Sequence, residues 1–177
     1  QEVKELPFSP KESENCNCII MDMRYVAKYK IEALLHGSHI GNEIEFLVFD
    51  HYGFPAFAKQ KSSLIYLMKN GDEYTHLKYE WDSVTPLLEG GFASCENTDF
   101  NDSEEELELK NYTYSPPIEV DLRHATKYQI EQYENDPLYQ FDGSVAKCVK
   151  GISAEDVFKA RLPEILEDLE YIKQNSK

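Results

Sequence analysis

Residues 63–81 read Ser-Leu-Ile-Tyr-Leu-Met-Lys-Asn-Gly-Asp-Glu-Tyr-Thr-His-Leu-Lys-Tyr-Glu-Trp and predict a β-hairpin. Asn70-Gly71 is the strongest turn signal in the chain, because both residues tolerate the positive φ angles of a tight hairpin turn. The two strands are expected at Ser63–Met68 and Glu73–Trp81. Alternation in the second strand places one set of side chains on each face: Tyr74, His76, Lys78 and Glu80 on one, and Thr75, Leu77, Tyr79 and Trp81 on the other.

The residues before this hairpin also favour strands. A long β-prone run covers 18–35, with Tyr25, Ala27 and Tyr29 alternating against charged neighbours. A second strand is expected at Glu43–Phe49, after a turn at 36–41, and another short strand near Gly91–Ser94. Residues 19–95 therefore contain about five strands separated by turns, a spacing that is typical of a small β-barrel or sandwich.

Composition changes after Cys95. Seven acidic residues and no basic residue lie between Glu96 and Glu108, which predicts a solvated acidic loop at 96–106. Further elements are expected beyond it: a strand within Leu107–Tyr114 that ends before Pro116-Pro117, a short helix at 125–135, and a strand at Val145–Val149.

The C-terminal region predicts an amphipathic helix over 153–175. Ser153 is a good N-cap residue, and Glu155 and Asp156 would lie beside the positive end of the helix dipole. Pro163 is expected to kink or restart the helix. Apolar residues step by four, three, four and three to form one stripe that predicts core packing: Phe158, Leu162, Ile165, Leu169 and Ile172.

These patterns predict a mainly β (α+β) protein. Residues 1–15 are polar and contain two prolines, so we expect an extended N-terminal arm. Residues 16–177 are expected to form a single β-rich domain, because a chain of 177 residues is long enough to bury one substantial core.

The net charge is −15, from 33 acidic and 18 basic residues. A nucleic-acid backbone and an anionic membrane surface would both be repelled. No apolar run approaches the roughly 18 residues of a membrane-spanning helix, so no membrane insertion is expected. The charge favours a basic protein partner, although it also serves solubility alone.

Four cysteines form an even set, as an oxidising compartment requires: Cys16, Cys18, Cys95 and Cys148. We predict two disulfides, each joining the Cys16/Cys18 pair to Cys95 or Cys148. Zinc is disfavoured because only one residue separates Cys16 from Cys18; four reduced thiols in a cytosolic protein are the alternative. With Gln1 as the first residue, the pattern favours an exported protein, periplasmic or extracellular, whose signal peptide has been removed.

Little in the sequence indicates catalysis or a cofactor. His36 and His39 are two candidate metal ligands without a third, and Asp50-His51 are sequence neighbours rather than convergent catalytic partners. The chain contains no nucleophile elbow, phosphate-binding glycine loop or HExxH motif. Two glycosylation sequons begin at Asn101 and Asn111, and a weak cation site in the acidic loop is a minor hypothesis. We therefore predict no cofactor, no metal and no catalytic residue.

Several segments together resemble the netrin-like module, the OB-type barrel of the tissue inhibitors of metalloproteinases: Cys16-Asn17-Cys18, Leu34-Leu35-His36-Gly37, Glu43-Ile44-Glu45-Phe46, Leu64–Met68 and Cys95. The resemblance covers residues 16–95 and implies a small OB-like antiparallel β-barrel, followed here by the C-terminal helix. In those inhibitors the first cysteine is the mature N-terminus and chelates the protease zinc. Fifteen residues precede Cys16 here, so that mechanism is not carried over.

Two classes of function follow from these observations. The first is an exported, non-enzymatic binding or inhibitory protein that recognises a protein partner through an acidic, tyrosine-rich surface. Its candidate contacts are Tyr52, Phe54 and Phe57 around the Gly53-Phe54-Pro55 loop, unless these side chains fold back onto the core. The alternative is a secreted hydrolase without a local signature, for which His51 or His76 would lie beside a carboxylate in a pocket. A structural envelope component is a third possibility.

Overall fold

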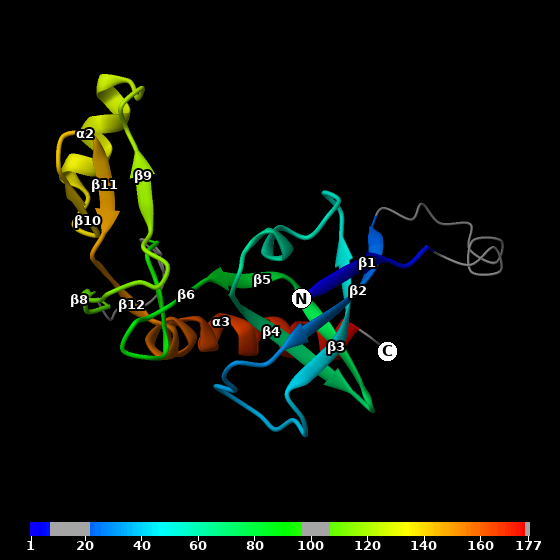
Figure 1. Cartoon of the computed structure of the whole chain (residues 1–177). Coiled ribbons are helices and arrows are strands. Elements are labelled where there is room, and N and C mark those ends of the chain that lie inside the picture. The colour runs from blue at the N-terminus through cyan, green and yellow to red at the C-terminus, as the bar shows by residue number, and fades with distance from the viewer. Residues whose placement is uncertain (8–21, 97–106, 176–177) are drawn as a thin grey trace. The chain divides into compact units, whose positions relative to one another are not determined.

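The computed structural model describes residues 1–7, 22–96 and 107–175, and Figure 1 shows their helices and strands. The chain forms two compact units, each with its own apolar cluster, where we expected a single domain at 16–177. The first unit contains residues 1–61, 65–81 and 169–177, and the second contains 62–64 and 82–168. Cys16, Cys18 and the predicted loop from residue 97 to 106 lie outside the described residues, as do residues 8–15 of the predicted arm.

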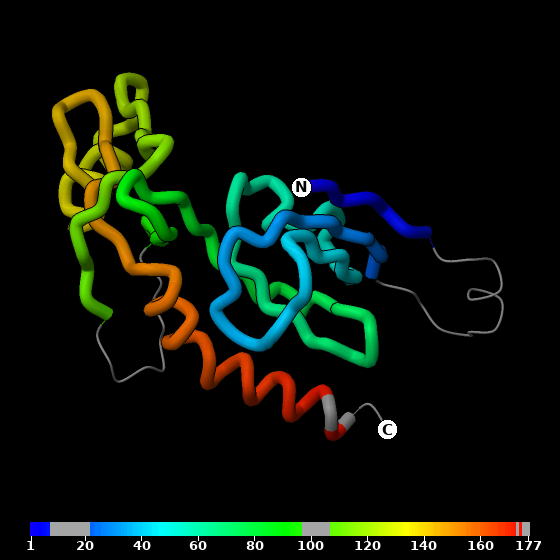
Figure 2. The backbone as a smooth tube through the Cα atoms, turned by 60° about the horizontal axis from the view of Figure 1, so that its bottom comes forward, coloured from blue at the N-terminus to red at the C-terminus, as the bar shows by residue number. Residues whose placement is uncertain are grey.

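A five-stranded sheet forms the first unit, with the order β1-β2-β3-β5-β4. Its strands are β1 (Glu2–Glu5), β2 (Met23–Lys30), β3 (Glu43–Asp50), β4 (Ser63–Asn70) and β5 (Glu73–Ser83). β2 pairs antiparallel with β1 and β3, whereas β3 and β5 pair in parallel. Figure 2 follows the chain from β2 through residues 31–42 into β3. The described residues contain three sheets and no closed barrel, so a mainly β fold is confirmed in this coarse form.

Alternation along the strands explains the core of this unit. Tyr25 and Ala27 in β2, and Phe46 and Val48 in β3, are buried on one face, as their spacing predicts. Phe57, in the short 3-10 helix η1 (Ala56–Lys59), packs into the same cluster and is 1% exposed. Part of the predicted N-terminal arm also joins the sheet, because β1 pairs with β2 over its four residues.

The second unit contains two small sheets. One has the order β6-β7-β12-β8, with β6 (Thr85–Pro86), β7 (Phe92–Ser94), β12 (Lys150–Ser153) and β8 (Lys110–Asn111). The other has the order β10-β11-β9, with β10 (Tyr139–Phe141), β11 (Val145–Cys148) and β9 (Glu119–Asp121). Of the strand expected within Leu107–Tyr114, only β8 is regular. The short helix expected at 125–135 is α2 (Lys127–Asn135), which begins with a capping box between Thr126 and Gln129.

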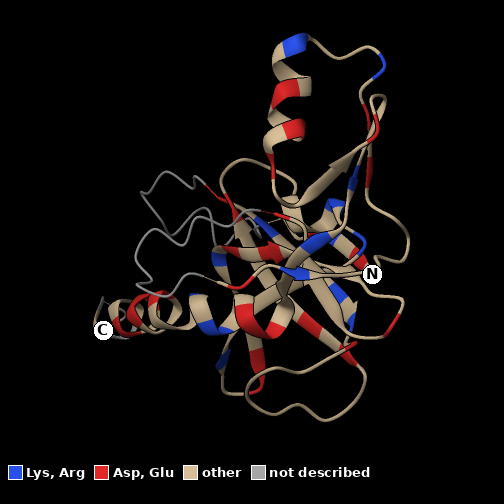
Figure 3. Ribbon diagram, turned by 90° about the vertical axis from the view of Figure 1, so that its left-hand side faces the viewer, with Lys and Arg blue, Asp and Glu red and all other residues tan. Residues whose placement is uncertain are grey.

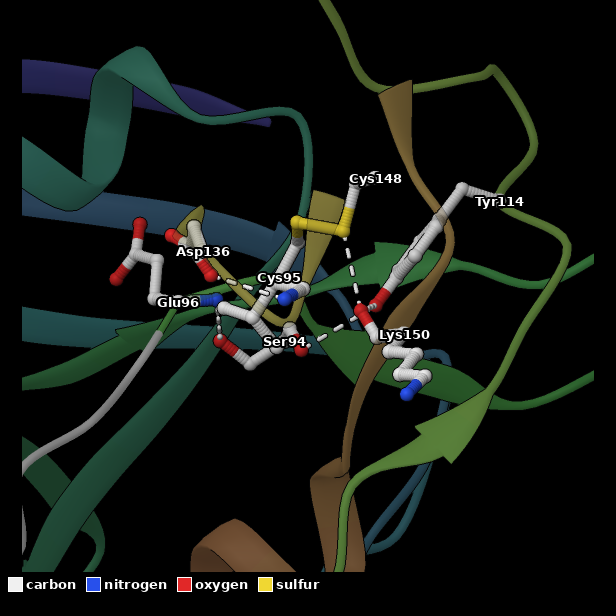
Figure 4. The surroundings of a disulfide bond; sticks show 8 residues. Ser94, Cys95, Glu96, Tyr114, Asp136, Cys148 and Lys150 are labelled. Atoms are coloured by element: carbon white, nitrogen blue, oxygen red, sulfur yellow. Dashed lines mark hydrogen bonds between the residues drawn. A yellow bond between two sulfur atoms is a disulfide. The ribbon is translucent and has the colours of Figure 1, made fainter. Parts of the chain in front are cut away.

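A disulfide joins Cys95, directly after β7, to Cys148 in β11, with Cα atoms 6.4 Å apart (Figure 4). The predicted pairing of each of these cysteines with Cys16 or Cys18 is therefore wrong. The physical reason is that β11 brings Cys148 into the same apolar cluster as Cys95, so the two sulfur atoms meet inside the second unit. Spacing along the chain contains no information about this contact.

Tyr114 and Gly151 pack closely beside the disulfide. The Tyr114 hydroxyl donates to the carbonyl oxygens of Lys150 and Ser94, at 3.0 and 3.3 Å (Figure 4). A Cβ atom at Gly151 would overlap both the Tyr114 hydroxyl and the Ser94 carbonyl. Residue 151 must therefore be glycine for the backbone to approach this closely.

The predicted C-terminal helix is confirmed as α3 (Ala154–Asn175). Ser153 caps it, since its Oγ accepts a hydrogen bond from the Asp156 backbone N–H at 3.1 Å and donates to the Asp156 carboxylate at 2.7 Å. Pro163 lies inside one continuous helix rather than at a restart. Ile165 of the predicted stripe is buried and the other four stripe residues are partly buried, whereas the buried Val157 lies outside that stripe.

Candidate interaction surface

The three predicted contact residues differ sharply in exposure. Tyr52 is 85% exposed and Phe54 is 50% exposed, which leaves both able to contact a partner. Phe57 is 1% exposed and packs against the rings of Tyr29 and Phe46, so its prediction as a contact residue is corrected. The loop thus divides its aromatic residues between the surface and the core.

Two further exposed side chains lie beside Tyr52 and Phe54. The ring of Tyr79 is 5.7 Å from that of Tyr52, centroid to centroid, and the Met23 side chain lies against Gly53. Tyr79 is 45% exposed and Met23 is 40% exposed. We call Met23, Tyr52, Phe54 and Tyr79 the aromatic patch. Sequence analysis missed Met23 and Tyr79, because alternation assigns each only to one of two faces.

The loop that carries Tyr52 and Phe54 is held by local backbone contacts. The Asp50 carboxylate accepts a hydrogen bond from the Tyr52 backbone N–H at 2.8 Å, which is an Asx-turn. Gly53 has a φ of 106°, a value that only glycine adopts readily. The rings of Phe54 and the buried Tyr25 meet in a T-shaped contact, with centroids 5.9 Å apart and planes inclined by 87°. These contacts fix the direction in which the two exposed rings project.

Tyr79 is presented by an unusual backbone conformation. It is the only non-glycine residue with positive φ in the described part of the chain, at 69°. This left-handed conformation costs roughly 1 kcal/mol or more for a residue with a Cβ. A hydrogen bond within the same strand bridges Tyr79: the Nε2–H of His76 donates to the Glu80 carbonyl at 3.0 Å. The alternation predicted for β5 consequently fails here, and His76 and Leu77 are both buried.

His76 itself belongs to the core. Its ring is 4.9 Å from the Phe57 ring and 6.5 Å from the Phe46 ring, and the residue is 6% exposed. Burial lowers the pKa of His76 to about 4, against smaller opposing effects from the Glu80 carbonyl and Asp50. His76 is therefore neutral at pH 7 and positions Tyr79 rather than contacting a ligand.

An ion pair lies at one edge of the aromatic patch. Lys78 donates to both Asp22 carboxylate oxygens, at 2.7 and 2.8 Å, and its Nζ is 5.2 Å from the centroid of the Tyr79 ring. The hydrogen bond that Lys78 donates to Asp22 raises the pKa of Lys78. His51 Nδ1 is 3.9 Å from the same carboxylate. Asp22 and Lys78 cancel each other in charge, so this edge is polar but close to neutral.

Two further carboxylates lie across the sheet from residues at or beside the patch. Glu5 lies opposite Tyr25 across the β1–β2 pairing, and Asp50 lies opposite Met23 across the β2–β3 pairing. The Tyr25 hydroxyl contacts the Met23 sulfur at 3.5 Å. Its pKa is raised by burial first, and then by the charges of Glu5 and Asp50. Neither carboxylate forms an ion pair with a lysine or arginine of the described residues.

The excess negative charge of the chain is concentrated in the second unit. That unit contains 20 acidic and 7 basic residues, whereas the first contains 13 and 11. Figure 3 shows acidic residues along both α2 and α3. Most of the acidic excess therefore belongs to a different unit from the aromatic patch, whereas we expected acidic residues and tyrosines to form one surface.

His39, one of the two candidate metal ligands, is instead within hydrogen-bonding distance of other parts of the protein. Both ring nitrogens of His39 are within hydrogen-bonding distance of other groups, the Tyr74 hydroxyl and the Glu43 carbonyl. Within residues 1–7, 22–96 and 107–175, no group of three or more metal-ligating side chains comes together. No helix of that same part of the chain is long and apolar enough to cross a membrane.

The chain matches no protein-family model, no curated protein and no solved structure.

Proposed function

We propose that this protein is an exported, non-enzymatic binding protein that contacts a protein partner through the aromatic patch of its first unit. The supporting observation is the exposure of four large side chains in one place: Met23 at the start of β2, Tyr52 and Phe54 in the loop after β3, and Tyr79 within β5. Aromatic residues and methionine are enriched where proteins bind one another, and grouped exposure of this kind carries a solvation cost in the free protein.

The way in which the patch is built supports the same proposal. Tyr79 adopts a strained backbone conformation that leaves its ring exposed, and the Tyr52 loop is fixed by Asp50 and Gly53. A strained residue on a surface is a candidate for function, since no gain in core packing offsets its cost. Rigid presentation also reduces the entropy lost on binding.

A hydrolase is less well supported. His76 is buried among phenylalanine rings, and the carboxylate that lies 3.9 Å from His51 Nδ1 is that of Asp22, which already pairs with Lys78. Export is supported by the disulfide between Cys95 and Cys148, because such bonds persist in oxidising compartments. The resemblance to the netrin-like module belongs to the same proposal. The order β1-β2-β3-β5-β4 favours it, because pairing of the two edge strands would close a five-stranded barrel of OB type.

An affinity capture from the native source tests this function. The baits are the wild-type chain, the double variant Tyr52→Ser/Tyr79→Ser, and Tyr128→Ser, which removes an exposed tyrosine of the second unit as the matched control. We expect one partner to be retained by the wild type and by Tyr128→Ser and lost from the double variant. Equal retention by all three baits, with every bait folded by circular dichroism, would contradict the proposal.

A further inference from the structure

We propose that the aromatic patch receives an arginine side chain of its partner. This inference rests on the proposed function and adds the chemistry of the group that is bound. The guanidinium would lie on the exposed rings of Tyr52 and Tyr79, and the carboxylates of Asp50 and Glu5 would supply the opposite charge.

The two tyrosine rings offer faces of the right kind. They stand 5.7 Å apart and are inclined by 40°, so they form a small tilted platform. An aromatic face attracts a cation that lies within about 6 Å of the ring centroid. Lys78 already occupies such a position over Tyr79, at 5.2 Å. The environment of this ring therefore accommodates a positive charge.

The charges around the patch select a cationic group. Lys78 is neutralised by Asp22, and both belong to one edge. Asp50 and Glu5 form no ion pair with a lysine or arginine of the described residues, so their charges remain available to a cationic group. An anionic ligand would be repelled there, and a neutral ligand would leave both carboxylates unpaired.

Arginine fits these groups better than lysine. Its guanidinium is planar, stacks on aromatic rings and can donate two parallel hydrogen bonds to one carboxylate. It is also less strongly hydrated than an ammonium group, so less hydration is lost when it stacks on a ring. Met23 and Phe54 would cover the methylene stem of the same side chain.

Labelled synthetic peptides test the inference on the full-length protein by fluorescence anisotropy at physiological salt. Three peptides share one glycine-serine sequence and carry arginine, lysine or citrulline at the same positions. Citrulline keeps the shape of arginine but has no charge. We expect arginine to bind at least about threefold more tightly than lysine, and citrulline to bind most weakly.

Variants show whether the patch is responsible, because an arginine peptide could also associate with the acidic second unit. Tyr52→Ala and Tyr79→Ala should each weaken arginine-peptide binding by about threefold or more. Asp50→Asn should weaken it as well, while its amide oxygen still accepts from the Tyr52 N–H. Tyr128→Ala is the control and should leave the affinity unchanged.

Equal affinity for the arginine and citrulline peptides would overturn the inference, as would wild-type affinity in all three patch variants. Together with the affinity capture, these measurements distinguish failure of the arginine inference from failure of the proposed function. A captured partner that depends on Tyr52 and Tyr79, together with no preference for arginine, would reject only the arginine inference. An arginine preference that depends on the patch, without a captured partner, would reject only the proposed protein partner.

Discussion

The Nε2–H of His76 donates to the Glu80 carbonyl at 3.0 Å, and this bond spans the left-handed residue Tyr79. A core side chain thereby determines how a surface ring is presented. His76 is also the histidine whose pKa burial displaces most strongly among the described residues, which links the stability of the first unit to pH.

Acid should destabilise the first unit through His76. The folded-state pKa is about 4, below the ordinary value of 6.5, so the unfolded chain takes up a proton first as the pH falls. The contribution of His76 to the free energy of unfolding is full above pH 6.5 and declines between pH 6.5 and 4. It is lost below pH 4, and the total loss is about 3 kcal/mol. Urea denaturation followed at a series of pH values measures the decline.

His76→Gln is the matched variant for this measurement. Its amide can still donate to the Glu80 carbonyl but does not titrate, so its stability should depend less on pH over the same interval. An equally steep decline in the wild type and in His76→Gln would show that another group is responsible.

The left-handed conformation at residue 79 predicts that a glycine and an alanine variant differ in stability but both lose binding. Tyr79→Gly and Tyr79→Ala remove the same ring, but only glycine adopts a φ of 69° without strain. We expect the glycine variant to be more stable than the alanine variant by about 1 kcal/mol in thermal unfolding. Both variants should bind the partner more weakly than the wild type. Greater stability of the alanine variant would refute the assigned backbone conformation.

Gly151 should tolerate no side chain. The added Cβ in Gly151→Ala would overlap the Tyr114 hydroxyl and the Ser94 carbonyl, with an expected cost of about 1–3 kcal/mol. Tyr114→Phe removes one of the two obstacles, so the double variant should lose less stability than the sum of the single variants. Strict additivity in chemical denaturation would argue that the two residues do not touch.

Peptide mapping should recover a disulfide-linked peptide that contains Cys95 and Cys148. In the chain-entropy model, a bond across 53 residues stabilises the fold by about 4 kcal/mol. Cys95→Ala/Cys148→Ala should therefore lower the midpoint of thermal unfolding, and most strongly for signals from the second unit. Recovery of either cysteine bonded to Cys16 or Cys18 would contradict the structure.

Patterns that repeat along the chain predicted individual strands and the C-terminal helix. β2 and β3 were predictable because one face of each strand is buried, which makes apolar residues alternate with charged ones. α3 was predictable from its cap and its apolar stripe. These features are local, and sequence displays local features directly.

Features that depend on contacts between distant residues could not be predicted. No residue close to Cys95 in the sequence indicates that Cys148 in β11 lies beside it in the fold. The sequence also does not show that Phe57 is buried and Tyr52 exposed, since both are aromatic residues of one loop region. Tyr79 was assigned to a strand face by alternation, and the reversal of its backbone depends on a bond from His76 three residues earlier.

Amide hydrogen exchange of the full-length protein, with and without its captured partner, tests the aromatic patch most directly. Binding at the patch predicts slower exchange at residues 50–54 and 78–80, where the backbone carries Tyr52, Phe54 and Tyr79. Slower exchange confined to residues 82–168, with residues 50–54 and 78–80 unchanged, would place the partner on the acidic second unit and contradict the account.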